Sequence, residues 1–104
     1  MYRNKKLLES AKHEPCVSCG NPNSCWAHSN LYRHGKGRGQ KAHDLFGAYL
    51  CLHCHDWFDG RNKSAPPSFT SAYWGDISED AKVRDWFRAM NERSLIIACE
   101  KGYL

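Results

Sequence analysis

Long apolar runs are missing from this sequence of 104 residues. No stretch approaches the roughly eighteen consecutive apolar residues of a membrane-spanning helix, so we expect no membrane partner. The N-terminal residues MYRNKKLLE lack the apolar run of a secretory signal. We therefore expect a cytoplasmic protein, whose thiols are kept reduced and are more suited to metal binding than to disulfides.

Internal repeats and low-complexity tracts are absent too, so neither a repeat array nor a disordered chain is expected. Hydrophobic residues make up 41% of the chain, with four Trp, five Tyr and four Phe. A chain this short buries only part of its surface, and a structural metal can substitute for missing core. We expect one α+β domain spanning residues 1–104, with a core at 14–62 and a helical extension at 76–101.

Acidic residues are scarce in the first part of the chain. Residues 1–63 carry ten Lys or Arg against five Asp or Glu, whereas residues 64–104 carry five against six. The net charge of +4 is therefore concentrated in the first part. This distribution favours a polyanionic partner such as nucleic acid, although a soluble surface alone also explains it.

Two cysteine pairs are the strongest motif. Cys16 with Cys19 and Cys51 with Cys54 are Cys-x-x-Cys turns separated by thirty-one residues. Two such turns supply the four thiolates of a closed, tetrahedral structural zinc site, which leaves no coordination position for substrate. Thiol redox chemistry at one pair is a weaker alternative. The two remaining cysteines are expected to be reduced and partly buried; they are Cys25 and Cys99.

The pattern predicts a short mixed succession of elements. A helix is expected over residues 4–13, strands over 25–28 and 45–50, and a helix over 54–59. A last helix begins near Asp76, with Asp76 and Glu79 or Ser78 as its cap, and ends near Gly102. Between the strands, residues 29–41 form an irregular basic loop with glycine at every second position from 35 to 39.

A histidine at the end of the first strand and two side chains on the following helix suggest hydrolysis. His55 and Asp59 have the i, i+4 spacing that places both on one helix face. Hydrolysis of a phosphodiester needs a base for the attacking water and a cation for the developing charge. His28 is the candidate base, and the helix pair offers two ligands for a divalent ion. A structural histidine and a solvated helix face are the alternatives.

These residues also resemble a known family. Each Cys-x-x-Cys turn is also called a knuckle, and the first one, at residues 16–19, is followed by a strand ending in His28, a loop and the run LCLHCH. This order is similar to that of the HNH, or ββα-metal, nucleases, including zinc-stapled phage endonucleases. The segments AH at 27–28, HDLFGA at 43–48, CLHCHD at 51–56 and DGR at 59–61 more closely resemble the YbcO-like nucleases that phages and prophages encode. The resemblance covers roughly residues 16–61.

The resemblance implies a zinc-pinned ββα-metal, treble-clef-like core that cuts DNA in the cytoplasm of a bacterial host. His28 matches the general base and His55 the first metal ligand. Asp59 matches the second ligand, and Asp44, or less closely His43, lies where the family orients the base. The catalytic ion implied is Mg²⁺ or another divalent ion such as Mn²⁺ or Ni²⁺.

Ala27 departs from the family pattern, in which His or Asp often precedes the base as a further ligand. Either His55, Asp59 and waters suffice, or His43 or Asp44 completes the shell, or His28 is itself a ligand. A non-catalytic zinc finger that binds nucleic acid or a protein is the remaining alternative. DNA or RNA, and monomer or dimer, stay open. The basic side chains expected to contact phosphate are Arg33, Lys36, Arg38, Lys41, Arg61 and Lys63.

Overall fold

The computed structural model describes residues 2–69 and 79–104. It contains a two-stranded antiparallel sheet and helices, in the order α1 (Lys5–Ser10), β1 (Cys25–His28), β2 (Gly47–Leu50), α2 (Leu52–Phe58) and α3 (Glu79–Glu100). Short 3-10 turns follow α1 at Ala11–His13 and precede β2 at Tyr32–His34. The α+β class and both strands are confirmed, although β2 is shorter than expected. Among the described helices, none has both the length and the apolar character needed to cross a lipid bilayer.

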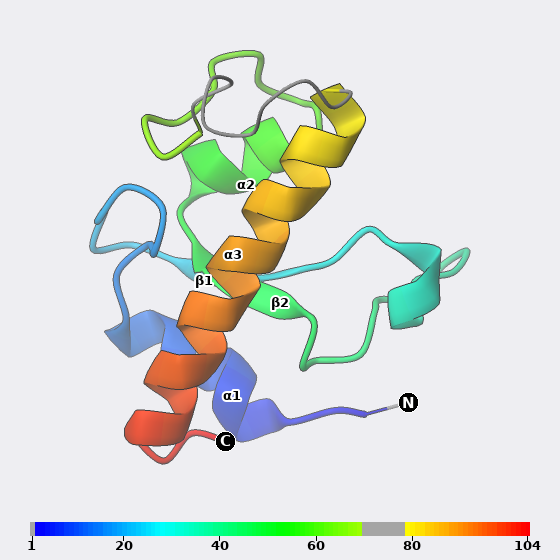
Figure 1. Ribbon diagram of the computed structural model, residues 1–104. Coiled ribbons are helices and arrows are strands. Elements are labelled where there is room, and N and C mark those ends of the chain that lie inside the picture. The colour runs from blue at the N-terminus through cyan, green and yellow to red at the C-terminus, as the bar shows by residue number, and fades with distance from the viewer. Residues whose placement is uncertain (1, 70–78) are drawn as a thin grey trace.

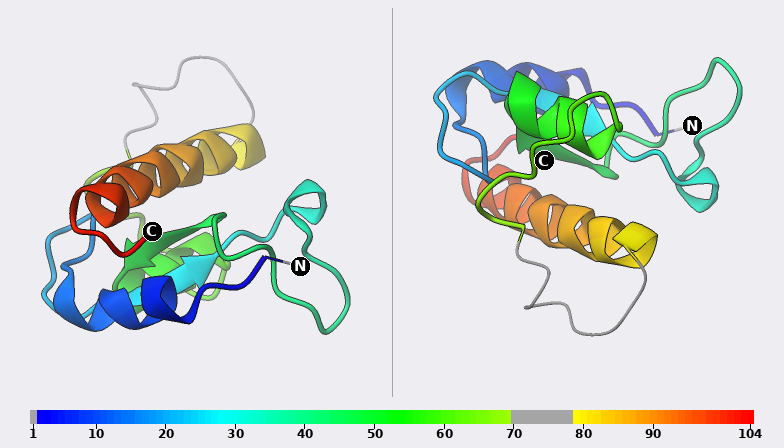
Figure 2. Two further views of the ribbon diagram at one scale, coloured as in Figure 1. Left: turned by 90° about the horizontal axis from the view of Figure 1, so that it is seen from below. Right: turned by 90° about the horizontal axis from the view of Figure 1, so that it is seen from above.

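The hairpin formed by β1 and β2 separates two small apolar clusters. Strand alternation places Trp26 and Tyr49 on one face, where they pack with Leu7 of α1. Ala27 and its partner Ala48 occupy the other face, with Trp86, Phe87 and Met90 of α3 and the buried cysteines. Figure 2 shows α1 and α3 on opposite sides of the hairpin. The hairpin is thus held from both faces despite its length of four residues per strand.

The outer edge of β2 is covered by α3 and by the first knuckle, the Cys-x-x-Cys turn at residues 16–19. Ser94 Oγ accepts a hydrogen bond from Tyr49 N at 3.0 Å, and Asn91 Nδ2 donates to the carbonyl oxygens of Leu45 and Gly47. Val17 N donates to Tyr49 O at 2.9 Å. An uncovered strand edge leaves backbone polar groups open to pairing with other chains. The polar residues of α3 therefore complete a sheet that has no third strand in the described part of the chain.

Residues 29–46, which we call the arm, connect the strands and project away from the helices (Figure 1). The arm contains the 3-10 turn and a bridge between Gly37 and Gln40. The expected loop is therefore partly ordered. Phe46 N donates to His43 O in a turn, which explains why β2 begins at Gly47 rather than at Leu45.

The buried carboxylate of Glu14 links the segment after the first 3-10 turn to the residues that follow α3. Glu14 is 3% exposed, and Lys101 Nζ donates to its two carboxylate oxygens at 2.8 and 2.9 Å. Tyr103 Oη donates to the same carboxylate at 3.1 Å. Gly102 ends α3 with φ of 78°, as expected from the sequence. The expected cap at Asp76 and Ser78 lies outside the described residues.

Candidate functional site

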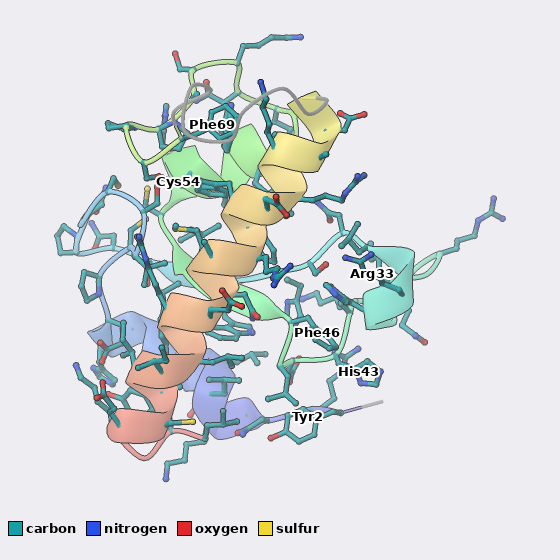
Figure 3. All side chains as sticks on the ribbon, in the orientation of Figure 1. Tyr2, Arg33, His43, Phe46, Cys54 and Phe69 are labelled. Atoms are coloured by element: carbon teal, nitrogen blue, oxygen red, sulfur yellow. The ribbon has the colours of Figure 1, made fainter. Side chains whose placement is uncertain are left out.

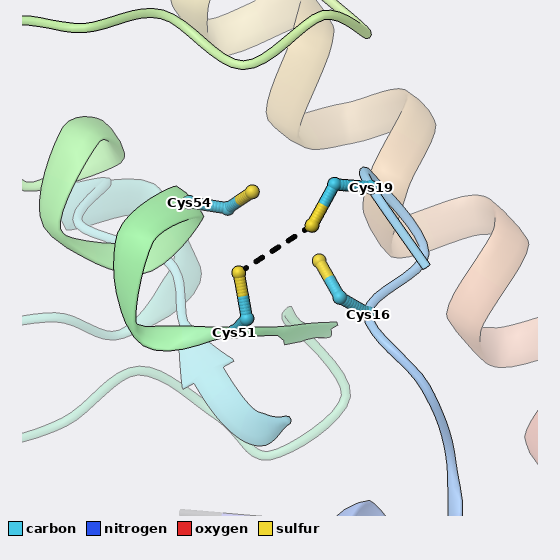
Figure 4. A group of neighbouring side chains, drawn as sticks. All are labelled: Cys16, Cys19, Cys51 and Cys54. Atoms are coloured by element: carbon cyan, nitrogen blue, oxygen red, sulfur yellow. Dashed lines mark hydrogen bonds between the residues drawn. The ribbon is translucent and has the colours of Figure 1, made fainter. Parts of the chain in front are cut away.

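The four knuckle cysteines converge on one point. Their sulfur atoms all lie within 4.8 Å of one another, and Cys19 Sγ is 3.6 Å from Cys51 Sγ. Figure 4 shows the two pairs facing each other, one from the first knuckle and one from the start of α2. In a tetrahedral zinc site, bonds of about 2.3 Å place sulfur atoms roughly 3.8 Å apart. The four cysteines can therefore hold a structural metal such as zinc; they are Cys16, Cys19, Cys51 and Cys54.

Local backbone geometry builds this cage. Gly20 N donates to Cys16 O at 2.9 Å, and the φ of 81° at Gly20 is one that L side chains rarely adopt. Cys51 is the N-cap of α2, so the helix begins earlier than expected and carries Cys54 one turn on. Burial raises the pKa of the Cys54 thiol, and the neighbouring thiols raise it further. Cys54 therefore favours the protonated thiol, whereas hydrogen bonds from the Cys54 backbone and from neighbouring thiols outweigh burial and lower the pKa of Cys51. A bound cation would favour the deprotonated form of both.

The two leftover cysteines are free but exposed, so the expectation that they are partly buried is wrong. Cys25 begins β1, at the outer end of the hairpin, and Cys99 lies on a solvent-facing position of α3. Neither cysteine belongs to the cage.

At the other end of β1, His28 is paired with Asp44. His28 Nε2 lies 2.8 Å from Asp44 Oδ1, and the two side chains are 11% and 2% exposed. Trp26 Nε1 donates to Asp44 O at 2.8 Å, so two side chains on one face of β1 fix this residue. If His28 donates through Nε2, its Nδ1 is left as the proton acceptor. Nδ1 makes no hydrogen bond within the described residues.

The N-terminal segment, residues 2–4, also binds the carboxylate of Asp44. Arg3 Nη1 donates to Oδ1 at 3.0 Å, and Asn4 N donates to Oδ2 at 2.6 Å. Arg3 also donates to the carbonyl oxygens of Lys41 and Ala42. Burial alone would raise the pKa of Asp44, but the bonds from His28, Asn4 and Arg3 outweigh it and lower the pKa below its ordinary value. Asp44 is therefore held as a carboxylate.

His43, the other residue expected to orient His28, makes different contacts. Its Nδ1 accepts a hydrogen bond from Tyr2 N at 2.9 Å, and its ring lies edge-on to Phe46. Asp44 N donates to Tyr2 O at 3.1 Å. His43 thus fastens the N-terminal segment to the arm, whereas the contact with His28 is made by Asp44.

The second predicted pair consists of His55 on α2 and Asp59, the C-cap of that helix. His55 Nε2 is 3.1 Å from Asp59 Oδ2, as the spacing of four residues predicts. Asn30 Nδ2 donates to Asp59 Oδ1 at 2.9 Å, and Cys25 Sγ lies 3.6 Å from His55 Nδ1. Neither Asn30 nor Cys25 was expected at this site. The contact from Cys25 shows that α2 lies beside the face of β1 opposite to that of Trp26 and His28.

In the described part of the chain, no hydrogen bond or ion pair joins the pair of His55 and Asp59 to the pair of His28 and Asp44. Within residues 2–69 and 79–104, the four cysteines are the one group of three or more metal-ligating side chains. A catalytic ion at His55 and Asp59 would thus have two protein ligands, with Ala27 buried and unable to supply a third. The structure assembles two separate pairs rather than one three-residue centre.

The predicted phosphate contacts are of two kinds. Arg33, Arg38 and Lys41 have exposed side chains on the arm, and Lys36 is half-buried there. Figure 3 shows Arg33 on the 3-10 turn of the arm. Arg61 Nη2 instead lies 3.2 Å from Asp56 Oδ1 and 2.9 Å from Asp59 Oδ2, so its charge is partly offset by α2. Lys63 lies beside a cleft between the arm and α3.

The comparisons with known proteins identify a family without a known activity. No curated protein and no solved structure matches the chain. A family described as "Protein of unknown function (DUF968)" matches residues 1–68, which include the N-terminal segment, both knuckles, the hairpin, the arm and α2. Because this match covers more than half of the 104 residues, the chain belongs to the DUF968 family.

Proposed function

We propose that this protein is a small endonuclease of the HNH type, similar to the YbcO-like nucleases, that hydrolyses phosphodiester bonds in DNA. The observation that carries the proposal is the pair of His28 and Asp44 at the end of β1. A buried carboxylate that orients an imidazole and fixes its tautomer is the arrangement of a general base. The basic arm beside it suits a polyanion.

In the proposed reaction, Nδ1 of His28 takes the proton of the attacking water. Asp44 holds the ring and stabilises the imidazolium that forms. His55 and Asp59 would hold Mg²⁺ or a similar divalent ion, which offsets the negative charge on the phosphate when it is bound. The thiolate cage joins the first Cys-x-x-Cys turn to the start of α2 and takes no part in the chemistry.

The test is nicking of supercoiled plasmid DNA with Mg²⁺, Mn²⁺ or Ni²⁺ in turn. His28→Ala should lower the rate by ~100-fold or more, as expected for a lost general base. His13→Ala is the matched control, because His13 is exposed on the 3-10 turn after α1. Cleavage that survives in His28→Ala, or is absent from the wild type with every metal, would refute the nuclease.

A non-catalytic module that binds nucleic acid is the second candidate. It is favoured by the buried Ala27 and by the division of the two polar pairs between opposite faces of β1. This candidate predicts DNA retardation in gels by wild type and His28→Ala alike, with no strand cleavage under any metal. Salt-sensitive binding lost on replacing Arg33 and Arg38 together would support it.

A further inference from the structure

A large concave surface begins directly after His28 but includes neither His28 nor Asp44. This cleft has a volume of about 1060 Å³. One wall is the arm, starting at Ser29 and Asn30, directly after His28; the other consists of the end of α2 and the first half of α3. We call it the arm cleft.

Each wall of the arm cleft carries a pair of stacked rings. On the arm, the rings of His34 and Phe46 have centroids 4.1 Å apart and lie within 12° of parallel. On the helical wall, Phe58 and Phe87 stack at 4.2 Å, also within 12°. His34, Phe46 and Phe58 are half-buried and so present part of their surface to the cleft. Flat, partly exposed rings in a cleft suit ligands that are themselves flat and aromatic.

Cations surround these rings. Arg33 on the arm, Lys63 after α2 and Arg84 on α3 are exposed and line the same cleft. Arg88 lines it as well but is paired with Glu92 at 3.6 Å. Asp80 and Asp85 also reach this surface, so the cleft is mixed in charge rather than uniformly positive. A ligand with separated anionic groups and flat rings fits this lining better than a simple anion does.

We propose that the arm cleft binds unpaired nucleotides of a nucleic-acid strand, with bases stacked on the aromatic rings and phosphates near Arg33 and Arg84. Aromatic stacking with a cationic groove is how proteins hold single strands, because every base offers a flat face. Bases within a duplex are already stacked and cannot enter such a cleft. The proposal rests on the proposed function and deepens it: the substrate is single-stranded or contains an unpaired segment.

The experiment measures binding of fluorescent oligonucleotides by anisotropy, without added divalent ion and in the His28→Ala background so that no strand is cut. Single-stranded DNA, single-stranded RNA of the same sequence and the DNA duplex are compared. We expect single strands to bind at least ~5-fold more tightly than the duplex. The comparison of single-stranded DNA with single-stranded RNA shows whether the sugar affects binding. Equal or tighter binding of the duplex would overturn the proposal.

Two matched pairs of variants locate the binding. Phe46→Ala removes one ring of the arm, whereas Phe46→Tyr keeps it. Arg84→Ala removes a cation from the cleft, whereas Arg93→Ala removes one from an exposed position of α3 that lines a different groove. We expect Phe46→Ala and Arg84→Ala each to weaken single-strand binding ~5-fold or more, and the paired variants to bind within ~2-fold of the parent.

Unchanged binding in Arg84→Ala, or an equal loss in Arg93→Ala, would overturn the proposal even if Phe46→Ala failed to fold. These binding measurements do not depend on whether the protein cleaves DNA. A protein that does not cut plasmid but shows this pattern refutes the nuclease and keeps the cleft. A protein that cuts through His28 but binds single strands normally in both cleft variants refutes the cleft and keeps the nuclease.

Discussion

Asp44 Oδ1 lies 2.8 Å from His28 Nε2 and 3.0 Å from Arg3 Nη1, so one carboxylate oxygen serves the strand-end imidazole and the N-terminal segment together. In the sequence, His28 is sixteen residues from Asp44 and Arg3 is forty-one residues from it. Buried ionised groups of this kind are stable only while every partner is present.

Asp44→Asn should therefore destabilise the protein by roughly 2–4 kcal/mol at neutral pH. The effect should depend on pH in a defined direction. Because the pKa of Asp44 is lower in the folded than in the unfolded protein, the unfolded protein binds more protons between these two values. The stabilisation by Asp44 is then fully present above the unfolded pKa of about 3.9 and is lost as pH falls through the folded pKa.

Urea unfolding of wild type and Asp44→Asn, with zinc in excess, measures this prediction. The difference in unfolding free energy should be constant above about pH 5 and should narrow below pH ~4. A difference that stays constant down to the acid limit would mean that the charge of Asp44 contributes nothing.

Gly47→Ala should destabilise the hairpin by ~1–3 kcal/mol. A Cβ at Gly47 would lie 2.3 Å from Trp26 Nε1, far inside contact distance, and would displace the ring that donates to Asp44 O. Gly37→Ala is the control, because a Cβ there meets nothing within 4 Å and its φ is not positive. Denaturant melts compare the two, and equal effects would contradict the packing described.

Cys54→Ser should abolish stoichiometric zinc binding and leave the domain largely unfolded. The four thiolates are the shared attachment of the first knuckle and α2, and the binding energy of such a site is also folding energy. Cys99→Ser, on an exposed position of α3, should keep the metal and the fold. Elemental analysis and circular dichroism measure both, and a Cys54→Ser protein that retains one zinc per chain would rule out the four-cysteine site.

Asp59→Ala should raise the concentration of Mn²⁺ or Mg²⁺ needed for half-maximal nicking by ~10-fold or more, because it removes one of two proposed ligands. Asp56→Ala is the matched control: Asp56 is an aspartate of α2 that also pairs with Arg61, but its carboxylate forms no ion pair with His55. Metal titrations of the nicking rate separate the two. Identical metal dependence in both variants would place the ion elsewhere.

Local sequence patterns predicted the elements well, and the reasons are physical. Three of these patterns each lie within a few residues of sequence. They are the two Cys-x-x-Cys turns, the placement of Trp26 and His28 on one face of β1, and the four-residue spacing of His55 and Asp59. The cage, the strand β1 and the end of α3 near Gly102 follow from such patterns.

Long-range partners were not predictable in the same way. Nothing near Arg3 indicates a carboxylate forty-one residues away, and nothing near Asn91 or Ser94 indicates that they cover the edge of β2. Cys25 was expected to be partly buried, but it is the first residue of β1, at one end of a two-stranded sheet, and it is exposed. The pairing of Asp44 with His28 was predicted from family resemblance rather than from local pattern.

The contact between Glu14 and Lys101 spans eighty-seven residues. During synthesis on the ribosome, Glu14 emerges long before Lys101. The ion pair cannot form until residue 101 has left the ribosome, so we expect the carboxylate to stay hydrated until then. A nascent chain arrested before residue 101 should be more open to proteases near Glu14 than a chain that includes Lys101.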